Sequence, residues 1–470
     1  MFLDDEFLLT TKTAKTLFDA CKDLPIIDYH CHLHPAEIEA DSNLPGIIAA
    51  WLGGRTVDGG YYGDHYKWRL MRANGVPEQL ITGDGDDWSK FQAFAVTMEK
   101  AVGSPVSLWT NLELRRIFGI NETLTSANAR AIFDRANELL ATSGFSTRNL
   151  IRRSNVQTVC TTDDPLDHLN AHKALATETS FKVVPAFRPD MALKPADEAF
   201  AGWLGRLEGE SGIVISRFAD LVQALASRVK YFHTAGARLS DQSLEAFRFK
   251  TADQQQLDQI LEVARTDGSQ LDDDQVAQFR TAMLLELLRV YNDFGWTAQL
   301  HLHASRNVNT AMARAYGPDT GFDSISDVDC AYDLALLLDT ASGQDELPRL
   351  IVYSVNPNNW AAIASILGCF QGGIEQRLAL GNAWWFNDTR SGIRSQLTNM
   401  AEYSLLGNFV GMTTDSRSFL SYPRHEFFRR VLCELVGEWA DRGEITDDMD
   451  QLTTLVCNIS YWNAKKYFAL

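Results

Sequence analysis

Leu24-Pro25-Ile26-Ile27-Asp28-Tyr29-His30-Cys31-His32 is the stretch that decides the fold, because an apolar run typical of a buried strand ends in two histidines. Side chains at positions i and i+2 of a strand point to the same side, so His30 and His32 can bind one divalent cation together. A His-x-His pattern alone is weak evidence, since isolated histidines are more often core or surface groups. A metal site here needs a further ligand.

A third candidate ligand, Asp415, follows far along the chain, where residues 409–415 form another apolar run that ends in a group able to bind a metal. A ligand pair on the first strand and a carboxylate on the last strand fit a closed barrel, in which these two strands are neighbours. We therefore expect His30, His32 and Asp415 to bind one metal ion. Nothing comparable in the sequence supports a second ion.

Short runs rich in β-branched and apolar residues recur along the chain and alternate with helical patterns, as expected for a parallel (β/α)8 TIM barrel. The eight runs are residues 24–32, 156–163, 182–188, 237–241, 297–303, 350–356, 378–386 and 409–415. The fourth run fits a strand least well.

Helices are predicted between these runs. The clearest has apolar side chains on one stripe, with Asp272 to Asp274 near its start and Gly295 near its end. Acidic residues favour a helix N-terminus and glycine favours a C-terminal stop. The stripe consists of Val276, Phe279, Met283, Leu284, Leu287, Leu288 and Tyr291. Helical segments are also expected within 127–141, 360–370, 392–406 and 425–440.

The connection between the first two runs, residues 33–155, is far longer than a crossover helix requires and is mostly helical in pattern. We expect residues 1–50 to begin the barrel, 51–150 to form a mainly helical insertion over its mouth, and 151–470 to complete it. The glycine-rich stretch 53–63 lacks the spacing of a phosphate-binding loop. It could act as a lid or hinge, or be an ordinary surface loop.

Composition restricts the class of protein. The chain has 470 residues, with 61 acidic and 43 basic residues and a net charge of −18, which argues against nucleic acid as a partner. Its seven cysteines, an odd number, fit a reducing compartment better than a disulfide framework. The acidic start and the lack of a long apolar segment predict neither a secretory signal nor a membrane span. We expect a cytoplasmic protein.

Barrel active sites lie at the carboxyl ends of the strands, so the polar residues that end each run are candidates for chemistry. Arg188 and Arg417 could offer guanidinium groups to a carboxylate or a developing oxyanion, although either alone could be a surface residue. His301 could add a ligand or transfer a proton. For His303, two positions later, a hydrogen-bonding role behind the site is favoured.

Two further groups of candidates lie outside the run ends just described. His65 and Tyr66, in Gly63-Asp64-His65-Tyr66-Lys67-Trp68-Arg69, could form an acid/base pair on a lid, but spacing alone favours a helix start with an aromatic anchor. Trp384 and Trp385 could form the wall of a pocket for a sugar, although aromatic residues more commonly pack in a core.

Seven ordered blocks of sequence resemble the uronate isomerase (glucuronate isomerase) family of the amidohydrolase superfamily, nearly from end to end. They include Asp28-Tyr29-His30-Cys31-His32, Phe187-Arg188-Pro189-Asp190 and Trp384-Trp385-Phe386-Asn387-Asp388. The others are residues 63–69, 299–301, 414–422 and 424–426. The resemblance implies a distorted (β/α)8 barrel. It also implies interconversion of D-glucuronate with D-fructuronate and of D-galacturonate with D-tagaturonate.

The resemblance assigns roles to individual residues. It makes His30, His32 and Asp415 the ligands of one divalent metal ion, usually zinc, and it favours the active-site interpretation of His65 and Tyr66. The expected catalytic residues are Tyr66, His65, Arg417, His301 and Asp415. The expected substrate-binding residues are Arg188, Trp384 and Trp385. The expected partner is a small uronate, and the chain is expected to form a homo-oligomer.

Three features depart from the family pattern. His303 stands where a small residue is expected, Gln242 stands where histidine is expected, and the turn at 53–62 is longer than usual. Two other classes of function stay open on sequence grounds. One is a mononuclear metal-dependent hydrolase of the same superfamily, which would use the metal to activate water. The other is a sugar-acid-binding protein without enzymatic activity.

Overall fold

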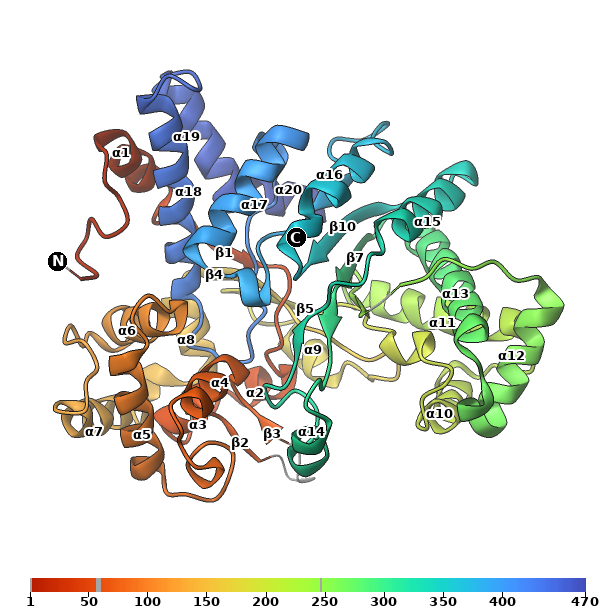
Figure 1. Ribbon diagram of the computed structural model, residues 1–470, viewed down its shortest axis with the longest axis horizontal. Coiled ribbons are helices and arrows are strands. Elements are labelled where there is room, and N and C mark those ends of the chain that lie inside the picture. The colour runs from red at the N-terminus through yellow and green to blue at the C-terminus, as the bar shows by residue number, and fades with distance from the viewer. Residues whose placement is uncertain (1, 56–60, 246) are drawn as a thin grey trace.

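The computed structural model describes residues 2–55, 61–245 and 247–470 of the chain, which form an α/β fold (Figure 1). Its strands are β1 (Ile26–Asp28), β2 (Gly54–Arg55), β3 (Tyr61–Tyr62), β4 (Val156–Cys160), β5 (Lys182–Val184), β6 (Gln242–Leu244), β7 (Thr297–Leu302), β8 (Ala304–Ser305), β9 (Ser324–Ile325), β10 (Arg349–Ser354) and β11 (Leu378–Leu380). Residues 56–60, within the glycine-rich stretch expected to act as a lid, hinge or surface loop, lie outside the described residues.

The helices lie around the strands, with α17 to α19 on one side, α10 to α13 on another and α5 to α7 on a third (Figure 1). The first half of the chain contains α1 (Lys12–Cys21), α2 (Pro35–Ala40), α3 (Ile47–Trp51), α4 (His65–Ala73), α5 (Asp87–Lys100), α6 (Pro105–Phe118), α7 (Ala129–Leu140), α8 (Thr147–Arg153), α9 (Asn170–Leu175), α10 (Phe200–Ser211) and α11 (Phe218–Thr234). The second half contains α12 (Gln254–Asp267), α13 (Asp273–Asp293), α14 (Thr310–Tyr316), α15 (Ala331–Gly343), α16 (Trp360–Gly368), α17 (Arg390–Tyr403), α18 (Pro423–Asp441), α19 (Met449–Cys457) and α20 (Asn463–Phe468).

The longer strands form two parallel sheets. One has the order β1-β4-β5 and the other β11-β10-β7-β6, with Val352 of β10 opposite Leu300 of β7 and Leu380 of β11. Two short antiparallel pairs, β2-β3 and β8-β9, lie outside these sheets. Parallel pairing with intervening helices is the arrangement that the alternating sequence pattern predicts.

Backbone contacts extend both sheets toward each other. Isolated parallel bridges pair Phe187 with Ser240 and Leu239 with Thr297, so the segment after β5 is connected to β7. At the other edge, Asp415 N donates a hydrogen bond of 3.2 Å to His30 O, and His32 N donates one of 2.9 Å to Ser416 O. The chain around Asp415 therefore lies directly beside the end of β1.

Two of the predicted runs differ from regular strands. Residues 409–415, within the described part of the chain, contain no assigned strand, and Gly411 (φ 81°) and Asp415 (φ 45°) have positive φ angles, which interrupt a pleated backbone. Residues 237–241 make only the isolated bridges, and the regular strand begins one residue later at Gln242. Apolar composition predicted where these segments lie, but it did not predict their backbone geometry.

The predicted helices agree well with the structure. The stripe ending at Tyr291 lies in α13, where the side chain of Asp272 accepts a hydrogen bond from Gln275 N and Gly295 follows with φ 64°. The segments expected within 127–141, 360–370, 392–406 and 425–440 correspond to α7, α16, α17 and α18. Capping residues and apolar periodicity are local signals, which explains why they located these helices correctly.

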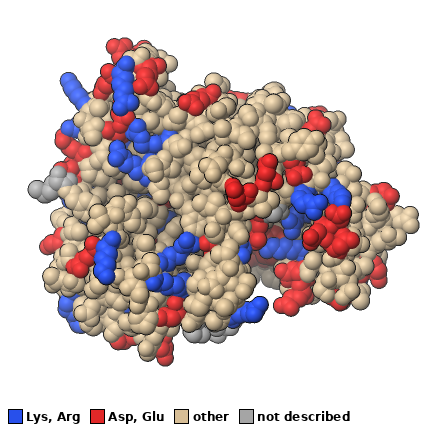
Figure 2. Space-filling model, in the orientation of Figure 1, with Lys and Arg blue, Asp and Glu red and all other residues tan. Residues whose placement is uncertain are grey.

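A buried apolar cluster receives side chains from most of the parallel segments, although not from β6 or β7. It includes Ile27 from β1, Cys160 from β4, Val184 from β5, Leu239, Ile351 from β10, Ala379 from β11 and Val410. A second, larger cluster contains most of the other buried apolar residues, from helices and strands alike. On the face drawn in Figure 2, acidic and basic side chains are interspersed. Within the described ranges, none of the helices combines the length and apolar character that a membrane span requires.

Candidate active site

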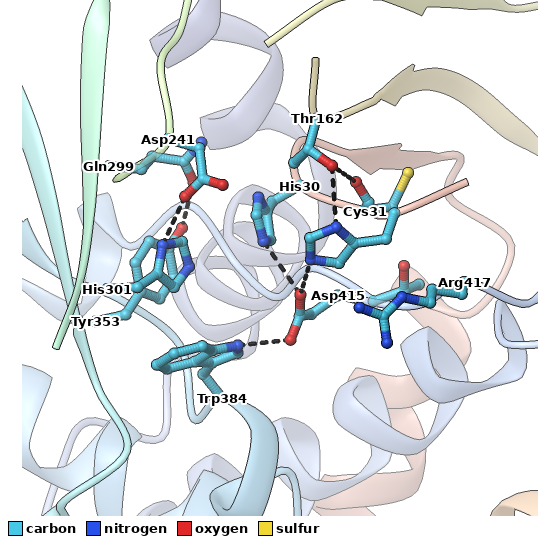
Figure 3. Close-up of polar contacts among 12 residues, drawn as sticks. His30, Cys31, Thr162, Asp241, Gln299, His301, Tyr353, Trp384, Asp415 and Arg417 are labelled. Carbon is cyan, nitrogen blue, oxygen red and sulfur yellow. Dashed lines mark hydrogen bonds and ion pairs between the residues drawn. The ribbon is translucent and has the colours of Figure 1, made fainter. Parts of the chain in front are cut away.

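The three side chains expected to bind a metal converge in the structure (Figure 3). Asp415 Oδ1 lies 3.1 Å from His30 Nε2 and 3.0 Å from His32 Nε2. Each residue offers a donor atom, and these atoms all lie within 4.8 Å of one another. Two imidazole nitrogens and a carboxylate oxygen form a set of ligands that suits zinc and similar divalent metals.

Backbone attachment of the 409–415 segment to β1 brings these ligands together. Asp28, in β1, accepts hydrogen bonds of 2.8 Å from Thr414 N and 2.5 Å from Thr414 Oγ1. Burial raises the pKa of Asp28 to about 6, while the Thr414 bonds oppose this shift. Because β1 and the Asp415 segment are joined immediately before the ligands, a pair at positions 30 and 32 and a carboxylate at 415 can meet.

Two polar neighbours fix the orientation of the ligands (Figure 3). Thr162 Oγ1 lies 2.9 Å from His32 Nδ1, within hydrogen-bond distance, while Nε2 of the same ring points to Asp415. The indole Nε1 of Trp384 donates a hydrogen bond of 2.6 Å to Asp415 Oδ2. Such outer partners fix the ring and carboxylate orientations that a metal requires.

The protonation states of Asp415 and His32 suit the role of ligand. Burial opposes ionisation of Asp415, but hydrogen bonds from His30 and His32 hold the pKa of its carboxyl well below the ordinary value. Burial lowers the pKa of His32 to about 4. Burial also acts to lower the pKa of His30, but Asp241 and Asp415 together raise it. An ionised carboxylate next to a neutral imidazole is ready to bind a cation.

A second cluster of charged groups lies beside the first. His301 Nδ1 is 2.7 Å from Asp241 Oδ1, and Arg188 Nη1 is 3.3 Å from Asp241 Oδ2. Arg188 Nε also donates a hydrogen bond of 2.9 Å to Asp190 Oδ2. His30, Asp241 and His301 could in principle hold a metal as well. Since Arg188 already neutralises Asp241, the group with Asp415 fits a cation better.

Aromatic rings hold His301 in place. Its ring stacks on Tyr353, with centroids 4.4 Å apart, and meets the edge of Trp384 at 4.5 Å. The Tyr353 hydroxyl donates a hydrogen bond of 2.7 Å to Gln299 Oε1. Burial lowers the pKa of His301. Its Nε2 is buried and has no hydrogen-bond partner among the described residues, so this nitrogen is free to contact a bound molecule.

His65 and Tyr66 begin helix α4, which Asp64 caps by accepting a hydrogen bond of 2.9 Å from Tyr66 N. The His65 ring stacks on Trp385 with centroids 5.1 Å apart. Burial, assisted by Arg417, lowers the pKa of His65 to about 4, and burial raises the pKa of Tyr66 well above its ordinary value. The pair therefore starts a helix, as the spacing favoured, and it also lies beside the site. Its role as an acid/base pair stays a prediction.

A cavity of about 190 Å³ joins the two clusters. It is lined by the three expected metal ligands together with His65, Arg188, Asp190, Asp241, Ser243, His301, Arg306, Asp319, Trp384, Trp385 and Arg417. Tyr66 instead lines an adjoining cavity of about 160 Å³, which shares His65, Asp415 and Arg417 with the first. The structure thus brings every sequence-predicted site residue to one of two adjoining cavities.

The sequence profile of the glucuronate isomerase family matches residues 1–468. This chain belongs to that family. It is 46% identical over 473 residues to a uronate isomerase of Caldanaerobacter subterraneus, covering 100% of this chain and 99% of the relative. It is 47% identical over 470 residues to a uronate isomerase of Lactococcus lactis, covering 99% of this chain and 98% of the relative.

Solved structures of glucuronate isomerase family proteins share the fold. A uronate isomerase from Thermotoga maritima superposes with a TM-score of 0.92 at 30% identity and covers 100% of both chains. A glucuronate isomerase from Caulobacter crescentus superposes with a TM-score of 0.89 at 25% identity, covering 99% of this chain and 97% of the other. The similarity extends over the whole chain.

The sequence analysis did not identify several charged residues that line the cavity of about 190 Å³. Asp241, named only as the end of a weak strand, pairs with both Arg188 and His301. Asp241 ends the predicted run 237–241, so its position could have identified it as a candidate. Arg306 follows the fifth run closely and could have been found in the same way. Asp319 lies in a loop far from the end of any predicted run, and no local pattern indicated it.

His303 and Gln242, the two residues expected to depart from the family pattern, both make hydrogen-bond contacts in the structure. His303 (φ 69°) lies behind the cavity, where its Nδ1 is 2.8 Å from Ser354 Oγ and its Nε2 is 3.2 Å from Cys330 Sγ. Gln242 Nε2 donates a hydrogen bond of 2.8 Å to the Tyr291 hydroxyl. Both side chains make buried hydrogen bonds away from the expected metal ligands.

Proposed function

We propose that this chain is a uronate isomerase that interconverts D-glucuronate with D-fructuronate and D-galacturonate with D-tagaturonate. The observation that carries the proposal is one cavity that combines the His30, His32 and Asp415 cluster with the guanidinium groups of Arg188 and Arg417. Membership of the glucuronate isomerase family supports the same activity. An aldose-ketose isomerase that acts on an anionic sugar needs these two kinds of group.

The metal in this proposal is one divalent ion, zinc by preference, held by His30, His32 and Asp415. Their donor atoms converge, their outer partners Thr162 and Trp384 fix their orientation, and the set suits zinc. When bound, the ion would supply positive charge to substrate oxygens. We propose that the segments carrying these ligands close a distorted (β/α)8 barrel, with residues 51–150 as an insertion over its mouth. The contacts between β1 and the Asp415 segment support this closure.

Arg188 is proposed to bind the carboxylate of the substrate, and Arg417 the oxygens near the reacting carbons. Asp241 and Asp190 raise the pKa of Arg188, although burial opposes this effect, so the guanidinium stays charged. A local cation matters because the chain carries a net charge of −18 and repels anions overall. Trp384 and Trp385 would enclose the sugar between their rings.

Isomerisation requires removal of the proton at C2, delivery of a proton at C1 and stabilisation of an enediol between the two steps. Tyr66, with His65 beside it, is proposed to exchange the C2 proton. Because burial holds the pKa of His65 at about 4, this ring is neutral at pH 7 and can accept a proton. Tyr66 keeps its phenolic proton at rest, because burial raises its pKa. It must therefore pass that proton to a neighbouring base before it can accept the C2 proton, and the His65 ring, whose centroid lies 4.7 Å from that of Tyr66, is proposed as this base. His301 Nε2 is the next available group.

The first test is incubation of the purified chain with D-glucuronate while formation of a ketose is followed. We expect ketose in the wild type. A matched pair of variants, His30→Ala and His34→Ala, tests the metal. The wild type is expected to contain one metal ion per chain, and His30→Ala should contain less. His34→Ala should keep the wild-type metal content, because His34 is not one of the three expected ligands. Binding of D-glucuronate without turnover would favour a sugar-acid-binding protein instead. Hydrolysis of an ester or amide without ketose formation would favour a hydrolase.

We also propose that the protein acts in the cytoplasm as a homo-oligomer. The seven cysteines, all free, support a reducing compartment. The assembly is measured directly by light scattering of the purified protein, and a monomer at micromolar concentration would contradict this part of the proposal.

A further inference from the structure

The cavity is bordered on one side by a segment that sequence reasoning did not connect with it. This segment, residues 317–323, joins α14 to β9 and is called the rim loop here. Arg69 Nη1 donates a hydrogen bond of 2.6 Å to Asp323 O, and Arg72 Nη1 donates one to Thr320 O. Both arginines belong to α4, the helix that begins with His65. The rim loop is therefore attached to the helix that carries the proposed proton-transfer pair.

The attachment is close. The Arg72 guanidinium lies over the Phe322 ring, 4.2 Å from its centroid. Gly321 has φ +94°, and a Cβ there would lie 2.9 Å from Arg72 Nη1 and 3.4 Å from His65 O. The positive φ favours glycine at the point where the loop backbone meets the first turn of α4. Thr320, next to it, is 1% exposed.

Asp319 projects from this loop between two arginines that line the cavity. Its Oδ1 lies 3.3 Å from Arg306 Nη1, and its Oδ2 lies 3.2 Å from Arg417 Nη2. One carboxylate therefore bridges a guanidinium from the segment after β8 and a guanidinium from the segment after Asp415. Asp319 has φ 58°, a left-handed conformation that aspartate adopts more readily than most residues.

The bridge closes a continuous set of contacts around the cavity. Arg306 also pairs with Asp323 Oδ2 at 3.0 Å, and its guanidinium lies over the Trp385 ring, 4.6 Å from the centroid. Trp385 in turn stacks on His65. The chain of contacts from Arg417 through Asp319 and Arg306 to Trp385 thus returns to the start of α4, where the rim loop is attached.

We propose that Asp319 is a positioning residue of the isomerase, which fixes the guanidinium of Arg417, together with that of Arg306, at the mouth of the cavity. This inference rests on the proposed function. Asp319 itself need not touch the substrate. It acts through Arg417, the group proposed to hold the oxygens of the reacting carbons, and it links the position of that group to helix α4.

The charge of Asp319 predicts an unusual kinetic signature. Removing the carboxylate leaves one more unpaired positive charge at the mouth, so an anionic uronate should bind at least as tightly as before. Without the bridge, however, Arg417 is no longer held in one orientation, and a misplaced group can cost roughly tenfold to a hundredfold in rate. We expect kcat to fall while KM stays equal or falls.

The experiment compares four full-length proteins: wild type, Asp319→Asn, Asp319→Glu and Asp329→Asn. Asp329 is a matched control, because it is an exposed aspartate near the rim loop that bonds only Ala331 N among the described contacts. With D-glucuronate, Asp319→Asn should lower kcat roughly tenfold or more without raising KM. Asp319→Glu should recover part of kcat, and Asp329→Asn should match the wild type. Loss of folded protein cannot produce a lower KM.

Hydrogen exchange of the same four proteins provides a readout that does not require turnover. Asp319→Asn should increase the exchange of amides in the rim loop and around Arg417, because the bridge joins these two segments. Unchanged kcat and KM, or a raised KM at unchanged kcat, would overturn the role of Asp319. If the wild type makes no ketose, the proposed function fails. In that case unchanged exchange in Asp319→Asn overturns the bridge, and increased exchange supports it.

Discussion

The indole Nε1 of Trp384 donates a hydrogen bond of 2.6 Å to Asp415 Oδ2, while both histidine nitrogens contact the other oxygen, Oδ1. The carboxylate is therefore held on both of its oxygens. The two oxygens have different partners, since Oδ2 accepts the hydrogen bond from Trp384 and Oδ1 faces the two imidazoles. The orientation of Asp415 depends on a residue that is distant in sequence and does not itself bind a metal.

Replacing Trp384 with phenylalanine should therefore weaken metal binding while the aromatic wall is kept. Loss of an outer partner of this kind typically costs about 10-fold to 100-fold in metal affinity or activity. Titration of the metal-free protein with zinc, followed by measurement of uronate turnover, tests this expectation. Trp360→Phe is a matched control, because Trp360 Nε1 also donates a buried hydrogen bond, to Ser354 O, but does not line the cavity. Equal zinc affinities in the two variants would contradict the role of Trp384.

Arg188→Met should reduce turnover of D-glucuronate far more than turnover of the matching neutral aldose, D-glucose. The guanidinium supplies the local positive charge that a carboxylate needs, and methionine keeps the aliphatic part of the side chain. Because Arg188 also neutralises Asp241, both substrates should lose some rate. The measurement is the ratio of kcat/KM for the two sugars. An equal loss for both sugars would mean that the substrate carboxylate is held elsewhere.

Turnover in deuterium oxide should introduce deuterium into the product, because an enediol route leaves the proton on a side chain long enough for exchange with water. A hydride shift would transfer the hydrogen directly and leave the product unlabelled. Tyr66→Phe should abolish both product and label, whereas His65→Asn should slow both to a smaller extent. Mass spectrometry of the ketose provides the measurement. Near-normal rates for Tyr66→Phe would transfer the proton-transfer role to His301.

The sequence predicted the parts of the site that follow periodic segments. His30 and His32 could be placed on one face because they end an apolar run, and Asp415 could be placed beside them because it ends another. Helices such as α13 were predicted because capping and apolar spacing are encoded locally. Irregular backbone was not predictable in this way. Gly411 and Asp415 have positive φ in a segment that is held by tertiary contacts with β1, including the bonds between Asp28 and Thr414, and such contacts are not encoded in a local pattern.

Ion pairs between residues far apart in the sequence were also not predictable. Asp319 reaches Arg306 and Arg417 from a loop whose composition is ordinary, and only the folded chain brings the three together. Arg69 and Arg72 were visible beside His65, but their partners are the backbone carbonyls of Asp323 and Thr320, which no sequence pattern identifies. Roles that depend on backbone carbonyls and distant loops therefore require the structure.

Asp163 gives the stability of the fold a dependence on pH that can be measured. The residue is 3% exposed, and burial raises the pKa of its carboxyl from 3.8 to about 7, although a hydrogen bond of 2.7 Å from Thr161 Oγ1 opposes this shift. A folded-state pKa above the unfolded value means that the folded chain binds the proton more tightly. The associated stability is present below pH 3.8, is lost as the pH rises toward 7 and changes no further above it.

Asp163→Asn should remove this loss, because the amide oxygen can still accept the Thr161 hydrogen bond and does not ionise. Each pH unit between the two pKa values is worth about 1.4 kcal/mol, so the free energy of unfolding of the variant should rise relative to wild type by about 2 to 3 kcal/mol between pH 5 and pH 7. Urea unfolding at pH 5, 6, 7 and 8 measures it. Asp84→Asn, at an exposed position, serves as the control and should show no such trend. A difference between Asp163→Asn and wild type that stays constant over this range would mean that the Asp163 carboxyl is ionised in the folded chain throughout, stabilised by groups other than Thr161.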